Sequence, residues 1–97
     1  MAGVIVRWTR RALLNLDAQA DHIAKDDPGA ARNMAARVFA CVDRLGEFPG
    51  LGRPGRVAGA RELVVDGTPY VVVYREAPMG VQVLHVLHGA RRWPASP

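Results

Sequence analysis

Histidine and cysteine side chains can bind a metal ion or attack a substrate, and this 97-residue chain contains three histidines and one cysteine. His85 and His88 are three positions apart in a β-branched stretch, and in a strand this spacing places two side chains on opposite faces. The two are therefore not expected to share a metal ion. His22 has no ligand partner nearby in the sequence, and the single cysteine, Cys41, lies in an apolar helical pattern that favours a buried, inert thiol. The sequence predicts no metal site and no cofactor.

A glycine-rich segment at residues 46–56 is the second candidate for chemistry, because such loops can hold phosphate groups. It contains four glycines and two prolines, but no helix follows it to supply aligned backbone amides. The segment is therefore predicted to be a loop that Phe48 and Leu51 pin to the core.

Arginine dominates the charge of the chain. The 13 basic residues include only one lysine, Lys25, and give a net charge of +4 with a pI near 10.2. Residues 53–97 hold six arginines against three acidic residues, a net +3, whereas residues 1–52 hold seven basic and six acidic residues, a net +1. This balance suits an acidic amphipathic peptide or a phosphate backbone as partner, although scattered, solvated arginines are the alternative.

The first half of the chain predicts a strand followed by two helices. Residues 3–8 are β-branched and aromatic, and Thr9 can cap a helix whose apolar face contains Leu13, Leu16, Ala20 and Ile23. Asp27 and Pro28 end this helix and begin another, because proline suits the first position of a helix. So short a connection requires an antiparallel helical hairpin. The second helix repeats apolar residues at Met34, Ala35, Val38, Val42 and Leu45.

The second half predicts three strands, at residues 61–65, 70–75 and 81–88, joined by turns at 66–69 and 78–80. The fold class is therefore α+β in the order β-α-α-β-β-β. One domain, residues 1–97, packs the helical hairpin on one face of a sheet based on an antiparallel meander. The first strand joins the sheet at an edge or beside the last strand.

The last two strands are apolar on both faces, as in residues 70–74 and 81–87. Because two helices cover only one side of a sheet, the other side is expected to present an apolar patch for a partner. Alternatively, the sheet curls so that loop 46–56 covers this side, or the protein is a homodimer. A domain of this size buries only about 60–65% of its unfolded surface, which fits a partner that covers more.

The chain has no signal-peptide pattern, no apolar run of the roughly 18 residues that span a bilayer, and no second cysteine for a disulfide. A cytoplasmic protein without membrane contact is expected.

Four short motifs occur in order along the second half: Gly52-Arg53, Arg61-Glu62-Leu63, a Tyr-x-x-x-Tyr-Arg stretch at residues 70–75, and a His-x-x-Arg stretch at residues 88–91. With the first strand, the helical hairpin and the Asp27-Pro28 break, this set resembles the RelE/ParE superfamily of type II toxin–antitoxin toxins across nearly the whole chain. The resemblance implies the same fold that the residue patterns predict.

The resemblance implies one of two activities. RelE-type members are ribosome-dependent endoribonucleases that cut messenger RNA, and ParE-type members poison DNA gyrase and are not enzymes. A ribonuclease needs proton-transfer groups and cations beside the scissile phosphate. Arg61 and Arg75 would hold the phosphate and His88 would transfer a proton, but Gly89 stands where the nuclease branch would place a tyrosine. This departure favours the ParE branch without a catalytic site. A superfamily member that serves only as a non-toxic binding module is a third reading.

The resemblance also implies partners. A cognate antitoxin of ribbon-helix-helix type is expected to lay an acidic amphipathic C-terminal segment over the toxin in a hetero-oligomer, and operator DNA would be bound only through the antitoxin. The residues of this chain that are candidates to contact the antitoxin are Trp8, Leu14, Tyr70, Val72, Tyr74 and Arg75. The candidate contacts to gyrase are Arg91, Arg92 and Trp93, since an aromatic beside cations is typical of binding hot spots. Alternatively, Trp93 folds back as an apolar lid.

Overall fold

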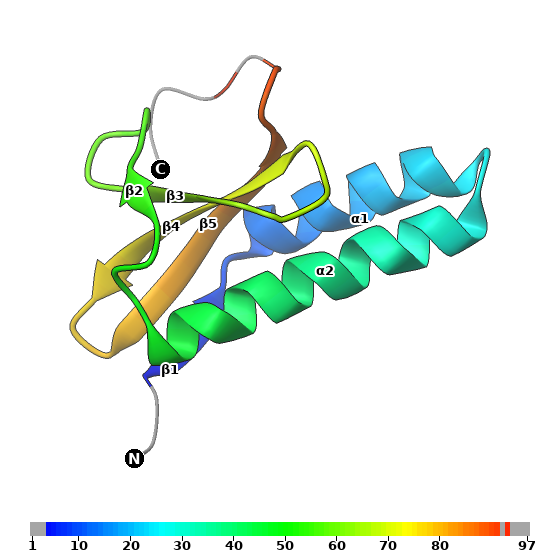
Figure 1. Ribbon diagram of the computed structural model, residues 1–97. Coiled ribbons are helices and arrows are strands. Elements are labelled where there is room, and N and C mark those ends of the chain that lie inside the picture. The colour runs from blue at the N-terminus through cyan, green and yellow to red at the C-terminus, as the bar shows by residue number, and fades with distance from the viewer. Residues whose placement is uncertain (1–3, 92, 94–97) are drawn as a thin grey trace.

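The computed structural model of the protein describes residues 4–91 and 93, and it contains the predicted elements in the predicted order (Figure 1). Two helices lie against one face of a mixed sheet, as the α+β prediction requires. Among the described residues, no helix is long and apolar enough to cross a membrane. The elements are β1 (Ile5–Trp8), α1 (Arg10–Ala24), α2 (Pro28–Glu47), β2 (Arg53–Pro54), β3 (Arg61–Val64), β4 (Tyr70–Ala77) and β5 (Gly80–His88).

Both helices begin at the residues that the sequence predicts. The Thr9 hydroxyl accepts a hydrogen bond from the Ala12 amide at 3.1 Å, and the Asp27 carboxylate accepts one from the Ala30 amide at 3.0 Å. Each bond satisfies an amide of a first turn that has no partner inside its helix. The short connection between α1 and α2 produces the antiparallel hairpin (Figure 1).

The sheet has five strands in the order β1-β5-β4-β3-β2, so the first strand lies both at an edge and beside the last strand. It pairs with β5 in parallel, whereas all other neighbours are antiparallel. Gly80 makes this pairing possible: its φ is +147°, and a Cβ atom there would overlap the carbonyl group of Ile5. The sheet is therefore the predicted antiparallel meander with the first strand added at its edge, and the parallel direction of that strand makes it mixed.

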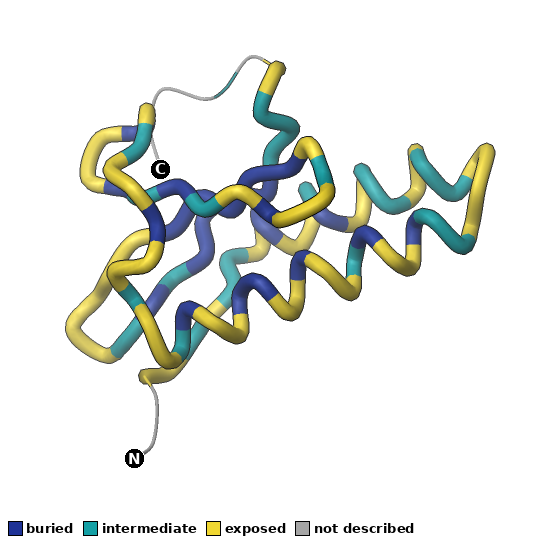
Figure 2. The backbone as a smooth tube through the Cα atoms, viewed as in Figure 1, coloured by how far each residue is buried: buried dark blue, intermediate teal, exposed yellow. Residues whose placement is uncertain are grey.

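The main core lies between the helices and the sheet, and the inward faces of both helices are buried against it (Figure 2). Leu16 is buried and Ile23 partly buried as predicted, but Leu13 is 44% exposed because Ala12 occupies the inward position of that turn. Strand β4 contributes every second residue to this core, namely Tyr70, Val72 and Tyr74. Strand β5 contributes Val81, Val83 and Val86, because a register shift opposite Val73 and Tyr74 interrupts its alternation.

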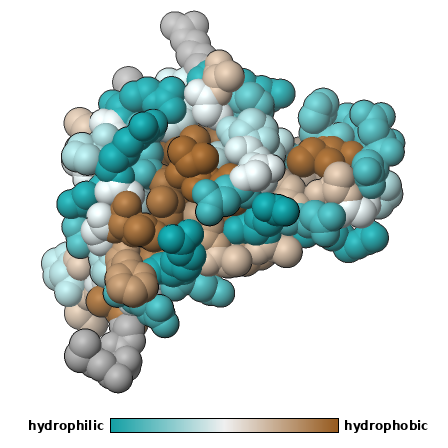
Figure 3. Space-filling view, viewed as in Figure 1, coloured by the Kyte–Doolittle hydropathy of each residue, from teal (hydrophilic) through white to brown (hydrophobic). Residues whose placement is uncertain are grey.

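The centre of the second face of the sheet is covered, so the expected apolar patch does not extend over the whole face and remains only beside the exposed Ile5 and Met79. Val73 and Leu84 are buried there under Val57 and Ala60, and Leu87 and Trp93 pack against the same cluster. The chain itself covers this part of the face, as in the alternative in which loop 46–56 covers it. The covering residues, Val57 and Ala60, come directly after that loop. On the side shown in Figure 3, apolar groups form several small patches between hydrophilic ones.

The Tyr74 hydroxyl, rather than the apolar residues of loop 46–56, holds that loop. It accepts a hydrogen bond from the Gly52 amide and donates one to the Pro49 carbonyl, each at 2.8 Å. Burial raises the pKa of Tyr74, more than the Gly52 amide lowers it, so the hydroxyl keeps its proton for Pro49. Phe48 and Leu51 are 60% and 39% exposed, so the prediction that they pin the loop is wrong. The loop also contains the short strand β2, which the sequence did not indicate.

Candidate functional site

The three residues of the ribonuclease hypothesis lie apart on the sheet. Arg61 pairs with Tyr74, whose ring lies in the helix-side core, so Arg61 also points to the helix side. Arg75 follows Tyr74 along β4 and therefore points to the other face. His88 pairs with Tyr70 at the far end of β4, about 16 Å along the strand from Arg75. The geometry does not bring these side chains around one reacting phosphate.

Arg61 and His88 are each held by contacts within the chain. The Arg61 guanidinium donates to the Gly52 carbonyl at 2.8 Å and forms an ion pair with Glu76 at 3.4 Å. The His88 Nδ1 accepts a hydrogen bond from the Ala90 amide at 3.2 Å, and the ring meets the edge of Tyr70 with centroids 5.7 Å apart. These contacts give both side chains a structural role, in the loop and at the end of β5.

The other residues that could bind a metal ion or act as a nucleophile also lie apart from one another. His85 pairs with Val73 on the face opposite to that of His88, and His22 is exposed on α1. Among the described residues, no group of three or more histidine, cysteine or acidic side chains could hold a metal ion. Cys41 is 6% exposed, and burial raises the pKa of its thiol, against the opposing effect of Arg44. A protonated, covered thiol is a poor nucleophile.

A buried carboxylate is the main feature that sequence reasoning missed. Glu62 is 3% exposed and accepts a hydrogen bond from the Arg56 backbone amide at 2.5 Å. The guanidinium groups of Arg56 and Arg53 lie 3.4 and 3.6 Å from its oxygens. Burial alone would raise the pKa of Glu62, but the Arg56 amide and the two guanidinium groups outweigh it and hold the pKa below its usual range. Its place in the strand pattern, between Arg61 and Leu63, was the signal that it points to the face away from the helices.

Arg56, which lies beside Glu62, also contacts Trp93 near the end of the chain. The Arg56 guanidinium carbon lies 3.3 Å from the centroid of the Trp93 ring, and Arg56 also donates to the Gly89 carbonyl at 3.3 Å. The Trp93 Nε1 donates to the His88 carbonyl at 3.0 Å. Trp93 is thus a partly buried lid on the second face of the sheet, as the alternative reading has it. Its neighbour Arg91 is exposed, and Arg92 lies outside the described residues.

The candidate antitoxin contacts do not form one surface. Val72 and Tyr74 are fully buried and Tyr70 is 8% exposed, so a partner cannot reach these three side chains without moving the helices. Trp8 is half-buried against Phe39 of α2, with ring centroids 5.3 Å apart.

The remaining two candidates are accessible but lie on different parts of the molecule. Leu14 is 54% exposed on α1, and Arg75 is exposed on the face of the sheet away from the helices. Only Trp8, Leu14 and Arg75 therefore stay candidate contacts in the free chain.

Comparison with known proteins matches residues 6–93 to the family described as the ParE toxin of the type II toxin–antitoxin system parDE. The chain is 46% identical over 89 residues to the protein Y4kP of Sinorhizobium fredii, covering 92% of each chain. It is 43% identical over 91 residues to Toxin RelE2 of Caulobacter vibrioides, covering 94% of this chain and 99% of that one. A solved structure, the chromosomal ParDE toxin–antitoxin system from P. aeruginosa, matches with a TM-score of 0.79 at 28% identity, covering 88% of this chain and 95% of the other.

Proposed function

The chain belongs to the ParE toxin family of type II toxin–antitoxin systems, and from this premise we propose that it inhibits DNA gyrase in the cytoplasm without catalysing a reaction. Membership of this family implies a cognate antitoxin as partner. The proposed antitoxin is of ribbon-helix-helix type, neutralises the toxin through an acidic amphipathic segment, and alone contacts operator DNA.

The separation of Arg61, Arg75 and His88 is the observation that carries this proposal. Cleavage of RNA requires a base, an acid and phosphate-binding cations within hydrogen-bond reach of one phosphate. Here Arg61 and Arg75 point to opposite faces of the sheet, and His88 lies at the other end of β4. Inhibition by binding has no such requirement, because it depends on surface complementarity alone.

Arg91, with Arg92 and Trp93, is the proposed contact to gyrase. Arg91 is exposed beside the Trp93 lid, and a hollow of about 170 Å³ lies next to them, lined also by Asn15 and Gln19 of α1. An accessible cation beside an anchored aromatic ring supports a protein-binding role for this end of the sheet.

The test uses the purified chain in two assays. The first measures supercoiling of relaxed plasmid by gyrase, and the second measures cleavage of messenger RNA on programmed ribosomes. Inhibited supercoiling with intact messenger RNA is expected. Ribosomal cleavage with unaffected gyrase would instead establish the RelE-type activity, and no effect in either assay, with no growth arrest on expression, would indicate a non-toxic binding module.

The gyrase surface is tested separately with Arg91→Gln. Because Arg91 makes no side-chain hydrogen bond or ion pair among the described residues, the variant is expected to keep its thermal stability and to lose inhibition. Arg32→Gln, an exposed arginine on α2, is the matched control for the loss of one charge. Equal inhibition by both variants would remove Arg91 from the proposed contact.

A further inference from the structure

A row of polar side chains crosses three strands of the sheet on the face away from the helices. Arg7 of β1 pairs with Gln82 of β5, and Gln82 pairs with Arg75 of β4. Directly paired residues of neighbouring strands point to the same face. The residues on either side of Gln82, Val81 and Val83, lie in the helix-side core, so the whole row points away from it.

The two arginines of this row lack the ion pairs that other arginines of the sheet region have. Arg53 and Arg56 lie beside Glu62, and Arg61 lies beside Glu76. Among residues 4–91 and 93, no carboxylate lies within ion-pair distance of Arg7 or Arg75. Their positive charge is therefore available to a partner.

Gln82 brings these charges into one site. The Arg75 Nε donates to the Gln82 Oε1 at 2.8 Å, and Gln82 lies on the strand between those of Arg7 and Arg75. With neighbouring strands about 4.8 Å apart, the two arginine backbones are separated by about 10 Å. An extended chain with carboxylates on alternate residues, about 7 Å apart, can place one near each guanidinium, since arginine side chains are long.

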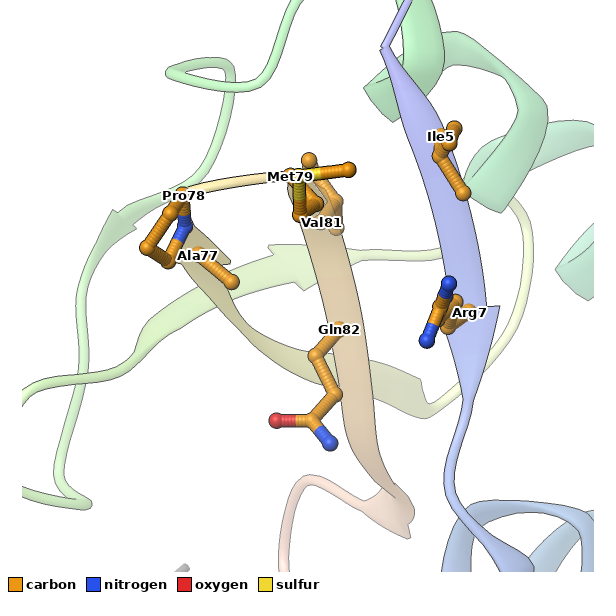
Figure 4. Close-up of a pocket in the computed structure, with 8 residues that line it drawn as sticks. Ile5, Arg7, Ala77, Pro78, Met79, Val81 and Gln82 are labelled. Atoms are coloured by element: carbon orange, nitrogen blue, oxygen red, sulfur yellow. The ribbon is translucent and has the colours of Figure 1, made fainter.

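An apolar hollow of about 240 Å³ adjoins the row, between β1 and the β4–β5 turn (Figure 4). Ile5 and Met79 line it and are 51% and 70% exposed, and Ala77 and Pro78 complete its apolar wall. None of the described residues that line the hollow is aromatic, so these residues offer no ring on which a nucleobase could stack. An aliphatic side chain fits this environment better.

We propose that this face binds an extended segment of a partner protein in which an aliphatic side chain precedes carboxylates on alternate residues. The carboxylates would accept hydrogen bonds from Arg7 and Arg75, and the aliphatic group would enter the hollow beside Ile5 and Met79. A phosphate backbone would satisfy the arginines but would leave the hollow unfilled. The inference rests on the antitoxin contact of the proposed function and deepens it, because it places the acidic segment on Arg7 and Arg75. The gyrase assay tests the other part of that proposal independently.

The experiment titrates the full-length ¹⁵N-labelled chain with two synthetic peptides and records two-dimensional NMR spectra. The first is acetyl-Ser-Leu-Ser-Glu-Ser-Glu-Ser-amide, and the second has glutamine in place of both glutamates. We expect the acidic peptide to shift the Gly80 amide, the Gln82 side-chain amide and the Arg75 Nε signal, and its twin to leave them in place. An absence of shifts at millimolar peptide, or equal shifts by both peptides, would overturn the proposal.

Three variants make the test specific. The double variant Arg7→Gln/Arg75→Gln is expected to weaken binding at least about tenfold. Arg32→Gln/Arg44→Gln removes the same charge from exposed positions of α2 and is expected to change it little. Met79→Ser, at a mostly exposed position, is expected to weaken binding without lowering the melting temperature. If both double variants lost the same peptide affinity, net charge alone would explain the loss and the proposed binding site would be overturned.

Two further measurements distinguish other occupants. A single-stranded deoxyoligonucleotide that shifts the same signals at lower concentration than the acidic peptide would make nucleic acid the occupant and overturn the proposal. Sedimentation showing a dimer of the wild-type chain that Arg7→Gln/Arg75→Gln dissociates would assign this face to a second copy instead. A monomer, with weaker shifts by the oligonucleotide, is the expected result.

Discussion

Tyr74 and Gly52 join the core of the molecule to its glycine-rich loop: the buried Tyr74 hydroxyl accepts a hydrogen bond from the Gly52 amide at 2.8 Å. A Cβ atom on residue 52 would lie only 2.8 Å from that hydroxyl, so glycine allows the loop to approach it. The same loop then supplies β2 and the arginines around Glu62. One buried hydroxyl thus positions the segment that carries Arg53 and Arg56, the two arginines beside Glu62.

Replacing Tyr74 with phenylalanine is expected to lower the free energy of unfolding by about 1–3 kcal/mol, because the Gly52 amide and the Pro49 carbonyl lose their partner. Urea unfolding measures this change, and hydrogen exchange should show faster exchange of the Gly52 amide. Tyr70→Phe is the matched control on the same face of β4, since the Tyr70 hydroxyl makes no hydrogen bond among the described residues. Equal stability losses in the two variants would contradict the role of Tyr74.

The low pKa of Glu62 makes part of the stability depend on pH. Since the folded-state pKa lies below the unfolded one, the ionised carboxylate stabilises the fold above the unfolded pKa, about 4.3. This contribution is lost as the pH falls through the folded-state pKa. Glu62→Gln is therefore expected to lower the free energy of unfolding at pH 7 by about 1–3 kcal/mol and to flatten its decrease below about pH 5.

Urea unfolding at pH 7, 5 and 3.5 measures both effects. The control is Glu76→Gln, because Glu76 is exposed and its ion pair with Arg61 is open to solvent. Its expected cost is below about 1 kcal/mol. A Glu62→Gln protein whose stability still falls with pH as steeply as the wild type would exclude Glu62 as the source.

Gly80→Ala is expected to destabilise the protein by about 3 kcal/mol or more, because a Cβ atom there meets the Ile5 backbone and the φ of +147° is unfavourable for alanine. The parallel pairing of β1 with β5 would separate first. Gly50→Ala is the control in loop 46–56, where a Cβ atom would have no neighbour within 4 Å. Thermal melts of both variants should differ clearly, and a melting temperature of Gly80→Ala close to that of Gly50→Ala would be inconsistent with this strain.

The sequence predicts those features of the fold that depend on residues close to one another along the chain. Thr9, Asp27 and Pro28 mark helix ends through bonds that span only a few residues, and these are confirmed. The parallel direction of β1 could not be predicted, because it depends on residue 80 meeting residue 5 across the fold.

The roles of the candidate site residues were harder to predict, because they too depend on contacts between residues far apart in the sequence. Nothing local to Tyr74 indicates that its hydroxyl holds loop 46–56 instead of facing a partner. The separation of Arg61 from Arg75 does follow from strand alternation once the register is known.

Cys41 provides a probe of global unfolding. Its thiol is 6% exposed and has a raised pKa, so both access and thiolate formation are suppressed in the folded state. Alkylation at pH 8 is expected to proceed at the rate of global opening and to accelerate in Tyr74→Phe. Mass spectrometry follows the reaction, and rapid alkylation of the native wild type would contradict the burial of Cys41.

Trp93 has two possible roles, as a lid on the sheet and as a contact to the target, and one pair of variants separates them. Trp93→Phe keeps a ring beneath Arg56 and loses only the Nε1 bond to the His88 carbonyl, so a cost below about 1.5 kcal/mol is expected. Trp93→Ala also uncovers the cluster around Val73 and Leu84, with an expected cost of about 2–4 kcal/mol. If Trp93 contacts gyrase, supercoiling inhibition should fall in Trp93→Phe by more than its stability loss explains, measured below the melting temperature. Inhibition that follows only the folded fraction of both variants would leave Trp93 as a lid, and Arg91 would then be the accessible contact at this end of the sheet.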